Sequence, residues 1–171
     1  MTKGEHKTPE YLEINPNGKI PALVDGDTKL WESNAIMQYI SSDSSLWPPN
    51  KSRYDIARWQ FWSNAHLGQA TGTIAFERVF KANFGMGDAD EAKVEAALAN
   101  FERFAGVLDG CLEGRDWLVG DAVSLADFSV AADFQYIPAA GVDMSAYANI
   151  TRWLAGLDEI DAWSKTAPQL G

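Results

Sequence analysis

The chain has 171 residues, of which 46% are hydrophobic and 22% are charged, a composition that excludes intrinsic disorder as the main state. Its 14 Lys and Arg against 24 Asp and Glu give a net charge of −10, which argues against a nucleic acid or an anionic membrane as partner. The single cysteine, Cys111, excludes an internal disulfide and a Cys-cluster metal site. Two histidines are too few to favour a metal centre, so we expect no metal.

No apolar run approaches the roughly 20 residues that a membrane-spanning helix needs. The N-terminus has no apolar stretch behind its lysine and does not look like a signal peptide. We therefore expect a cytoplasmic protein that does not insert into a membrane.

The first forty residues alternate turn signals with short apolar runs. The sequence at 15–18 is typical of a turn, and Asp25-Gly26 between two apolar segments predicts a hairpin. Ser33 is predicted to cap a helix that runs to about residue 40. The stretch that follows is rich in Ser and Pro, which is typical of a linker. We therefore predict an N-terminal domain over 1–43, a linker over 44–52 and a C-terminal domain over 53–171.

Beyond residue 53 the apolar spacing is helical. A long helix is predicted over 53–83, and Asp88 and Glu91 have the spacing of a capping box for a second helix. In that helix, over 94–112, Cys111 fits the apolar stripe and is predicted to be a buried small side chain rather than a nucleophile.

The last third of the chain predicts three more helices. The one that begins after Ser124 is apolar nearly all round, so we expect it to be central and buried, ending near Pro138 and Gly141. Further helices are predicted over 147–157 and 160–164. The C-terminal domain is therefore expected to be all-α.

Six spaced motifs occur in order along the chain: Gly4-Glu5-His6-Lys7-x-Pro9-x-x-Leu12, Asn15-Pro16-x-Gly18-Lys19-Ile20-Pro21-Ala22-Leu23, Asp25-Gly26-Asp27, Leu30-x-Glu32-Ser33-x-Ala35-Ile36, Phe76-Glu77-x-Val79-Phe80-Lys81 and Trp117-Leu118-Val119-Gly120-Asp121-x-x-Ser124-Leu125-Ala126-Asp127. Together they resemble the glutathione transferases, most closely the phi-type sequences of plants and their bacterial relatives. The resemblance covers nearly the whole chain. It implies the second half of a thioredoxin-like domain, with two strands and one or two helices, followed by an all-α domain, so that the chain is mostly helical.

The resemblance also implies a missing part. Members of the family begin with a β-α-β unit before the region of Gly4, and that unit carries the hydroxyl or thiol that activates glutathione, a serine in phi-type members. The catalytic residue is therefore unknown in this chain and expected in the missing segment. This leaves open whether the chain is active as it stands and whether Met1 is the natural start.

Glutathione is an extended tripeptide with two carboxylates, an ammonium and a thiol. The resemblance implies that the Ile20–Pro21 bond is cis and that the backbone of Ile20 pairs with the cysteinyl part of the ligand. Ser33, at a helix N-terminus, would bind the γ-glutamyl carboxylate, and Glu32 would face the ammonium. The alternatives are an ordinary trans proline at a strand start and an ordinary capping serine beside a solvated acid.

Three basic residues complete the implied glutathione site. His6, Lys7 and Lys19 match family positions that contact the glycyl carboxylate or the ligand backbone, and the alternative is a solvated basic turn. Ser124 and Asp127 match the family's helix-capping motif, so we interpret them as structural.

Two features concern the second substrate and the assembly. Trp59, Trp62 and His66 are candidates to line a pocket for the electrophile, although packing between helices is the commoner use of such residues. Asn17 stands where many family members have an aromatic residue that docks into the partner subunit. A homodimer remains the expectation, without this anchor.

The implied function is glutathione transfer in detoxification, in which the thiolate of glutathione attacks a small electrophile or reduces a peroxide. One alternative is a non-catalytic binder of glutathione or a hydrophobic ligand. Another is a protein-interaction module, because the strand at 22–24 would have an open edge, and open edges recruit other chains.

Overall fold

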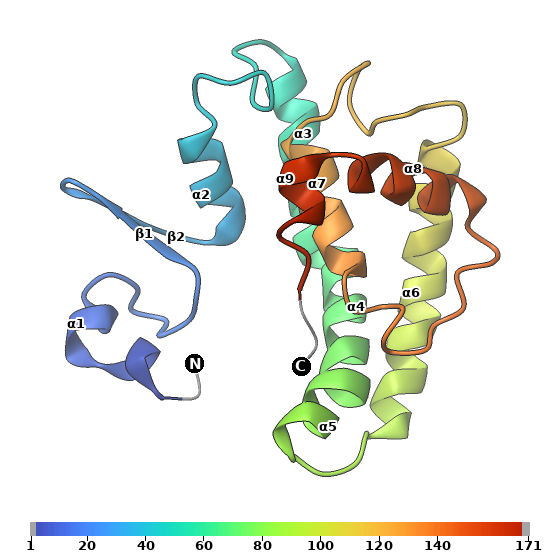
Figure 1. Ribbon diagram of the computed structural model, residues 1–171, viewed down its shortest axis with the longest axis horizontal. Coiled ribbons are helices and arrows are strands. Elements are labelled where there is room, and N and C mark those ends of the chain that lie inside the picture. Colours follow the sequence, from blue (N-terminus) through green and yellow to red (C-terminus); the bar gives the residue numbers. More distant parts are fainter. Residues whose placement is uncertain (1–2, 169–171) are drawn as a thin grey trace. The chain divides into compact units, whose positions relative to one another are not determined.

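The computed structural model describes residues 3–168 of the chain. These form two compact units, residues 1–49 and residues 50–171, called here the N-terminal unit and the helical unit (Figure 1).

The N-terminal unit consists of short elements joined by tight turns. A 3₁₀ turn, Glu5–Lys7, leads into α1, Pro9–Leu12, which is capped by the hydroxyl of Thr8. The strands β1, Ala22–Asp25, and β2, Thr28–Trp31, form an antiparallel hairpin (Figure 1), and α2 follows over Ser33–Ile40. The predicted hairpin at Asp25-Gly26 is confirmed.

Polar contacts, rather than a core, connect these elements. No hydrophobic side chain in residues 3–49 is buried. The Lys29 ammonium donates to the carbonyl of Glu13 at 3.2 Å, which ties the hairpin to the end of α1. The Tyr39 hydroxyl donates to Asp25 Oδ2 at 2.9 Å, which ties α2 to the hairpin. A hairpin with so little apolar burial is only marginally stable by itself.

The helical unit begins with one long helical path. It runs through α3 (Ser52–Trp62), a π-helical turn (Ser63–Leu67), α4 (Gly68–Ala75), a second π-helical turn (Phe76–Phe80) and α5 (Lys81–Phe84). The long helix predicted over 53–83 is therefore confirmed. It ends at Gly85, whose φ of 63° is readily adopted by glycine.

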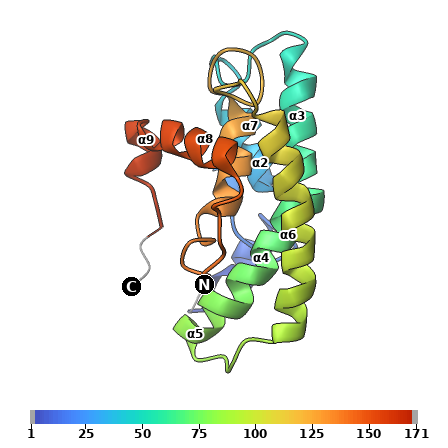
Figure 2. The same ribbon diagram turned by 90° about the vertical axis from the view of Figure 1, so that its right-hand side faces the viewer.

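The next helix, α6, Glu91–Cys111, lies beside α4 (Figure 2). Its cap is Asp90, which accepts a hydrogen bond from the N–H of Lys93, so the predicted capping box at Asp88 was wrong by two residues. Tertiary contact sets this start, because the N–H of Asp90 donates to the buried carboxylate of Glu77 at 2.8 Å.

Cys111 is exposed, so the prediction that it is buried was also wrong. At the end of α6 the buried side chains are those of Leu108 and Leu112, which lie four residues apart and therefore on the same face. Cys111 stands one residue before Leu112 and is turned away from the stripe by about 100°.

The buried helix predicted after Ser124 is α7, Leu125–Ala131, which continues into a 3₁₀ turn, Ala132–Phe134. The Ser124 hydroxyl accepts from the N–H of Ala126, and Asp127 Oδ2 accepts from the N–H of Ser124 at 2.9 Å. The implied cap formed by Ser124 and Asp127 is therefore present, and it fixes the start of the central helix.

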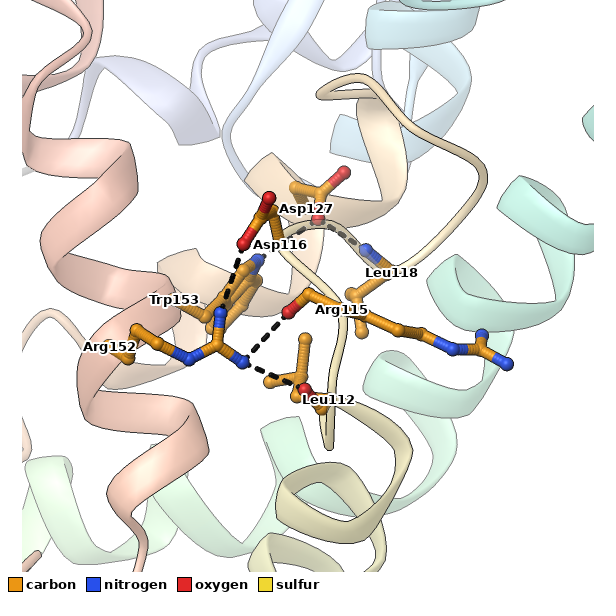
Figure 3. A network of polar contacts seen from close by, with 7 residues as sticks. All are labelled: Leu112, Arg115, Asp116, Leu118, Asp127, Arg152 and Trp153. Atoms are coloured by element: carbon orange, nitrogen blue, oxygen red, sulfur yellow. Dashed lines mark hydrogen bonds and ion pairs between the residues drawn. The ribbon is translucent and has the colours of Figure 1, made fainter.

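Asp127 does more than cap its own helix. Its Oδ1 accepts from the N–H of Leu118 at 2.9 Å and from the indole N–H of Trp153 at 3.0 Å (Figure 3). Trp153 belongs to α8, Ala148–Asp158, which α9, Asp161–Ser164, follows. Asp127 is fully buried, so one carboxylate joins the loop before α7 to α7 and α8.

Arg152 on α8 fastens the same loop from outside (Figure 3). One guanidinium nitrogen donates to the carbonyls of Leu112 and Arg115, both at 2.8 Å, and the other pairs with Asp116 at 3.2 Å. None of the helices in the described part of the chain combines the length and the apolar character that crossing a membrane requires.

Candidate functional site

The predicted glutathione-contacting residues all lie in the N-terminal unit. The turn at Gly18 lies against two of the basic ones, His6 and Lys7. Gly18 has a φ of 56°, and a Cβ there would lie 3.0 Å from Lys7 Nζ and 3.1 Å from the carbonyl oxygen of His6. A side chain is therefore disfavoured by both backbone conformation and space. The glycine lets the 3₁₀ turn with His6 and Lys7 lie against the segment that leads to Lys19.

Two residues that the sequence analysis did not single out hold the next peptide. The Asn15 side-chain amide and the Tyr11 hydroxyl both donate to the carbonyl of Lys19, each at 2.7 Å. Asn15 is 2% exposed, and its Oδ1 also accepts from the backbone and side chain of Asn17. Burial of a turn asparagine depends on tertiary contacts, so the Asn-Pro-x-Gly signal indicated the turn and not this anchoring role.

The Ile20–Pro21 peptide bond is cis, as the resemblance implied. The Ile20 side chain is 57% exposed. Among residues 3–168, the backbone N–H and C=O of Ile20 have no hydrogen-bond partner. A donor and an acceptor on one exposed residue are the groups that an extended peptide uses when it adds to a strand.

Glu32 and Ser33 begin α2, but not as a serine cap. The N-cap residue is Glu32, at φ 72° and ψ 116°, and Ser33 is the first helical residue, so the prediction that Ser33 caps the helix was wrong. A positive φ on a non-glycine residue is a strained conformation of the kind concentrated at functional sites.

The conformation of Glu32 leaves polar groups of Ser33 available. The carbonyl of Glu32 accepts from the N–H of Ile36 at 3.0 Å, which closes the first turn of the helix. Within the described part of the chain, the hydroxyl and the N–H of Ser33 have no hydrogen-bond partner. Such groups at a helix N-terminus are suited to an anion.

The strand register brings the two elements together. Ala22 stands opposite Trp31, so Ile20–Pro21, just before β1, and Glu32–Ser33, just after β2, lie at the same end of the hairpin. This end therefore presents an unpaired backbone donor and acceptor next to a helix N-terminus and one carboxylate. Lys19 precedes it directly in the chain, and the Gly18 turn adds His6 and Lys7.

The candidates for a second-substrate pocket lie in the helical unit. Trp59 is 3% exposed and belongs to the core, with its ring 5.1 Å from that of Trp62. His66 stacks on Phe104 with ring centres 4.9 Å apart, and Trp62 contacts both rings edge-on. His66 and Phe104 also line a groove of about 530 Å³ between the long helical path and α6. The structure therefore brings the rings of Trp62 and His66 into contact and places Trp59 in the core, and of these three residues His66 lines the groove.

One carboxyl of the helical unit has an unusual environment. Asp133 accepts from the Ser63 hydroxyl at 2.7 Å, and burial raises the pKa of Asp133 to about 6 against the opposing effect of that hydrogen bond. Within residues 3–168, no group of three or more His, Cys, Asp or Glu side chains is arranged to hold a metal ion.

Two family models match the chain. The model described as the glutathione S-transferase N-terminal domain matches residues 1–42, and that of the glutathione S-transferase C-terminal domain matches residues 66–160. The second match alone covers more than half of the chain.

Solved structures agree with the family models. A glutathione S-transferase-I bound with lactoylglutathione is 29% identical, with a TM-score of 0.87 over 97% of this chain and 82% of that one. Poplar glutathione transferase F1 is 27% identical, with a TM-score of 0.85 over 96% and 79%. A glutathione transferase from Phanerochaete chrysosporium in complex with oxidized glutathione is 29% identical, with a TM-score of 0.82 over 96% and 78%.

Proposed function

Because the chain belongs to the glutathione transferase family, we propose that its N-terminal unit binds glutathione for reaction with a small electrophile. The observation that carries the proposal is the end of the hairpin, where the unpaired backbone of Ile20 lies at the same end as the start of α2. Relatives bound to lactoylglutathione and to oxidized glutathione support glutathione as the ligand.

Each part of the tripeptide has a chemical counterpart at this end of the hairpin. The cysteinyl backbone pairs with the N–H and C=O of Ile20 in the manner of an added strand, beside Pro21. The γ-glutamyl carboxylate takes the N–H and hydroxyl of Ser33, where the partial positive charge of the helix start favours an anion. Glu32 faces the ligand ammonium.

The basic residues serve the other end of the ligand. His6, Lys7 and Lys19 bind the glycyl carboxylate or the ligand backbone and locally offset the repulsion of an anion by a chain of net charge −10. His6 Nδ1 is enclosed and has no hydrogen-bond partner among the described residues. Asn15 and Tyr11 position this segment by holding the carbonyl of Lys19.

The reaction proposed is attack of the glutathione thiolate on an electrophilic carbon, which forms a carbon–sulfur bond as the leaving group departs. The alternative is attack on a peroxide oxygen, which breaks the oxygen–oxygen bond, releases the alcohol and gives a sulfenate that a second glutathione converts into the disulfide and water. The pKa of a free thiol is about 8.5, so turnover requires a group that favours the thiolate, and we assign that role to no residue of the chain. His66 at the groove, with Trp62 packed against it, is proposed to contact the electrophile, whereas Trp59 lies in the core. By family resemblance we further propose a cytoplasmic homodimer that acts in detoxification.

Isothermal titration calorimetry with glutathione tests the binding proposal. We expect saturable binding to the chain and an affinity about tenfold lower for Ser33→Ala, because a charge-assisted hydrogen bond is lost. Ser45→Ala is the matched control, since Ser45 is an exposed serine of the same unit outside the site. Absence of binding, or equal affinities for the two variants, would contradict the proposed site.

A further inference from the structure

The long helical path departs from α-helical geometry at the π-helical turn Ser63–Leu67, which separates α3 from α4. The carbonyl of Ser63 accepts from the N–H of Gly68, five residues further on. Such turns are rare, and they occur frequently at functional sites. Here the turn contributes His66 to the wall of the groove between the long helical path and α6, so the geometry of the turn shapes that wall.

Asp133, in the 3₁₀ turn after α7, contacts both ends of the π-helical turn. Ser63, the first residue of the turn, is 3% exposed and donates its hydroxyl to Asp133 Oδ2 at 2.7 Å. Gly68 follows the turn, and a Cβ there would lie 3.0 Å from both Asp133 Oδ1 and the Ser63 carbonyl oxygen. The absence of a side chain at residue 68 therefore leaves the room that the carboxyl occupies.

The elements around Asp133 supply no cation to balance a charge on its carboxyl. α4, which packs against the 3₁₀ turn, carries no ionisable side chain. In α7 the ionisable residue is Asp127, whose carboxylate bonds to the preceding loop and to α8. The π-helical turn carries His66, which stacks on a ring of α6, and in α3 Arg58 pairs with Asp55. Accordingly, burial raises the pKa of Asp133 to about 6, against the opposing effect of the Ser63 hydrogen bond.

We propose that Asp133 is a pH-sensitive latch on the π-helical turn: the protonated carboxyl keeps the turn closed, and ionisation favours an opened turn in which the charge reaches water. A buried charge without a cation is costly, whereas a neutral carboxyl stays in the same place without that cost. Opening breaks the bond from the Gly68 N–H to the Ser63 carbonyl and separates Ser63 from Asp133. The groove wall is then ordered at acidic pH and loosened near neutral pH, whatever the groove binds.

The titration of Asp133 tests its contact with the turn. Carbon-detected NMR of the side-chain carboxyls should give Asp133 a midpoint near 6. Gly68→Ala should lower that midpoint by about one pH unit, because a Cβ pushes the carboxyl toward water. Ser63→Ala should raise it, since the lost hydrogen bond favours the ionised form.

Gly72→Ala is the matched control for Gly68→Ala. Both glycines lie in α4, and a Cβ at Gly72 would meet no atom within 4 Å, so the midpoint of Asp133 should not change. Equal midpoints in the two glycine variants would overturn the latch. A midpoint at the ordinary value of 3.8 in the unmodified chain would overturn it as well.

Amide exchange measured by NMR tests the opening. The N–H of Gly68 is protected by its bond to the Ser63 carbonyl, so its protection factor reports on the turn. That factor should fall roughly tenfold from about pH 5 to about pH 7, the change that linkage gives for a carboxyl shifted by burial in the closed turn alone. The fall should depend little on urea below the unfolding transition, because a local opening exposes little surface.

Two variants separate Asp133 from the other titrating group of the turn. Asp133→Asn keeps the size of the side chain and removes its charge, so the protection factor of Gly68 should no longer change between these pH values. His66→Gln should keep the tenfold fall. The latch is overturned if Asp133→Asn retains the pH dependence or His66→Gln loses it. It is also overturned if the fall has the full urea dependence of global unfolding, since the opening would then not be confined to the turn.

Discussion

The two units of this chain differ in which side chains they bury. Every buried hydrophobic side chain in residues 3–168 belongs to the helical unit, from Ile56 to Leu157, and the N-terminal unit has none. The buried residues of the N-terminal unit that carry side chains are the polar Asn15 and Ser41. Since burial of apolar area dominates folding stability, the helical unit supplies its own stability and the N-terminal unit does not.

Hydrogen bonding shows the same contrast. In the helical unit the buried carboxylate of Asp127 accepts from four groups of Leu118, Ser124 and Trp153, so its capacity is used internally. In the N-terminal unit the backbone of Ile20 and the hydroxyl of Ser33 have no partner among the described residues. The difference teaches that groups left unsatisfied by the fold are concentrated where a ligand is proposed to bind, in the unit least able to stabilise itself.

The largest expected effect compares the units directly. Hydrogen exchange followed by mass spectrometry should show amides of β1, β2 and α2 exchanging several orders of magnitude faster than those of α6 and α7, because local opening exposes little apolar surface in the N-terminal unit. Saturating S-methylglutathione should slow exchange in the N-terminal unit selectively. Equal protection of both units in the free chain would contradict the comparison.

Removing the central carboxylate should break the helical unit. Asp127→Ala leaves the N–H groups of Leu118 and Ser124 and the indole N–H of Trp153 buried without an acceptor, so the free energy of unfolding should fall by about 3–5 kcal/mol. Urea denaturation followed by far-UV circular dichroism measures this loss. Asp121→Ala, at an exposed position in the preceding loop, is the control and should change stability little.

Replacing Asp133 should increase the free energy of unfolding, because the pKa of this buried carboxyl is raised. The pKa is about 6 in the folded chain against 3.8 for an ordinary aspartate, so the stability this group contributes is present below about pH 4 and lost as the pH rises through 6. Asp133→Asn should therefore raise the free energy of unfolding at pH 7 by about 1–3 kcal/mol and flatten its pH dependence between 4 and 6.

Asp143 provides a control of opposite direction for that experiment. The backbone N–H of Ser145, followed by the Ser145 hydroxyl, lowers the pKa of Asp143, so its contribution is present at neutral pH and lost on acidification. Asp143→Asn should not stabilise the chain at pH 7. The free energy of unfolding of both variants is measured from pH 4 to pH 7. If it changes with pH in the same way in the two variants, the assignment to Asp133 is refuted.

A smaller loss of stability is expected at the N-terminus of α8, which Asp109 of α6 caps. Asp109 on α6 accepts from the N–H groups of Asn149 and Ile150 and from the Asn149 side chain, at 2.9 to 3.0 Å. Asp109→Ala should lower the free energy of unfolding by about 1–2 kcal/mol, the usual range for a lost cap. Glu113→Ala, an exposed carboxylate just beyond α6, is the reference, and a loss as large as that of Asp127→Ala would show that the α8 contact is more than a cap.

Patterns within a few residues predicted much of the fold. The hairpin at Asp25-Gly26 follows from its turn residues, and the long helical stretches follow from apolar spacing. The resemblance added the cis Ile20–Pro21 bond and the cap formed by Ser124 and Asp127, both of which the structure shows. The residues of the proposed site could be named from the sequence because they sit in contiguous motifs, and their role in binding stays a prediction.

Where distant contacts decide, the same patterns failed or were silent. Asp88 was predicted to cap α6, but the bond from the N–H of Asp90 to Glu77, thirteen residues away, selects Asp90. Cys111 has the spacing of a buried residue, yet in the folded chain Leu108 and Leu112 occupy the buried face and Cys111 is exposed.

By itself, the sequence determined the order of the elements, the family and the residues at the proposed site, because turn propensity, helical periodicity and motif order act over short ranges. Tertiary structure alone decided that Glu32 adopts a positive φ, that Ser33 is therefore not the cap, and that Tyr11 and Asn15 hold the carbonyl of Lys19. These features depend on which groups the folded chain brings within hydrogen-bonding distance, and local propensity carries no information about that.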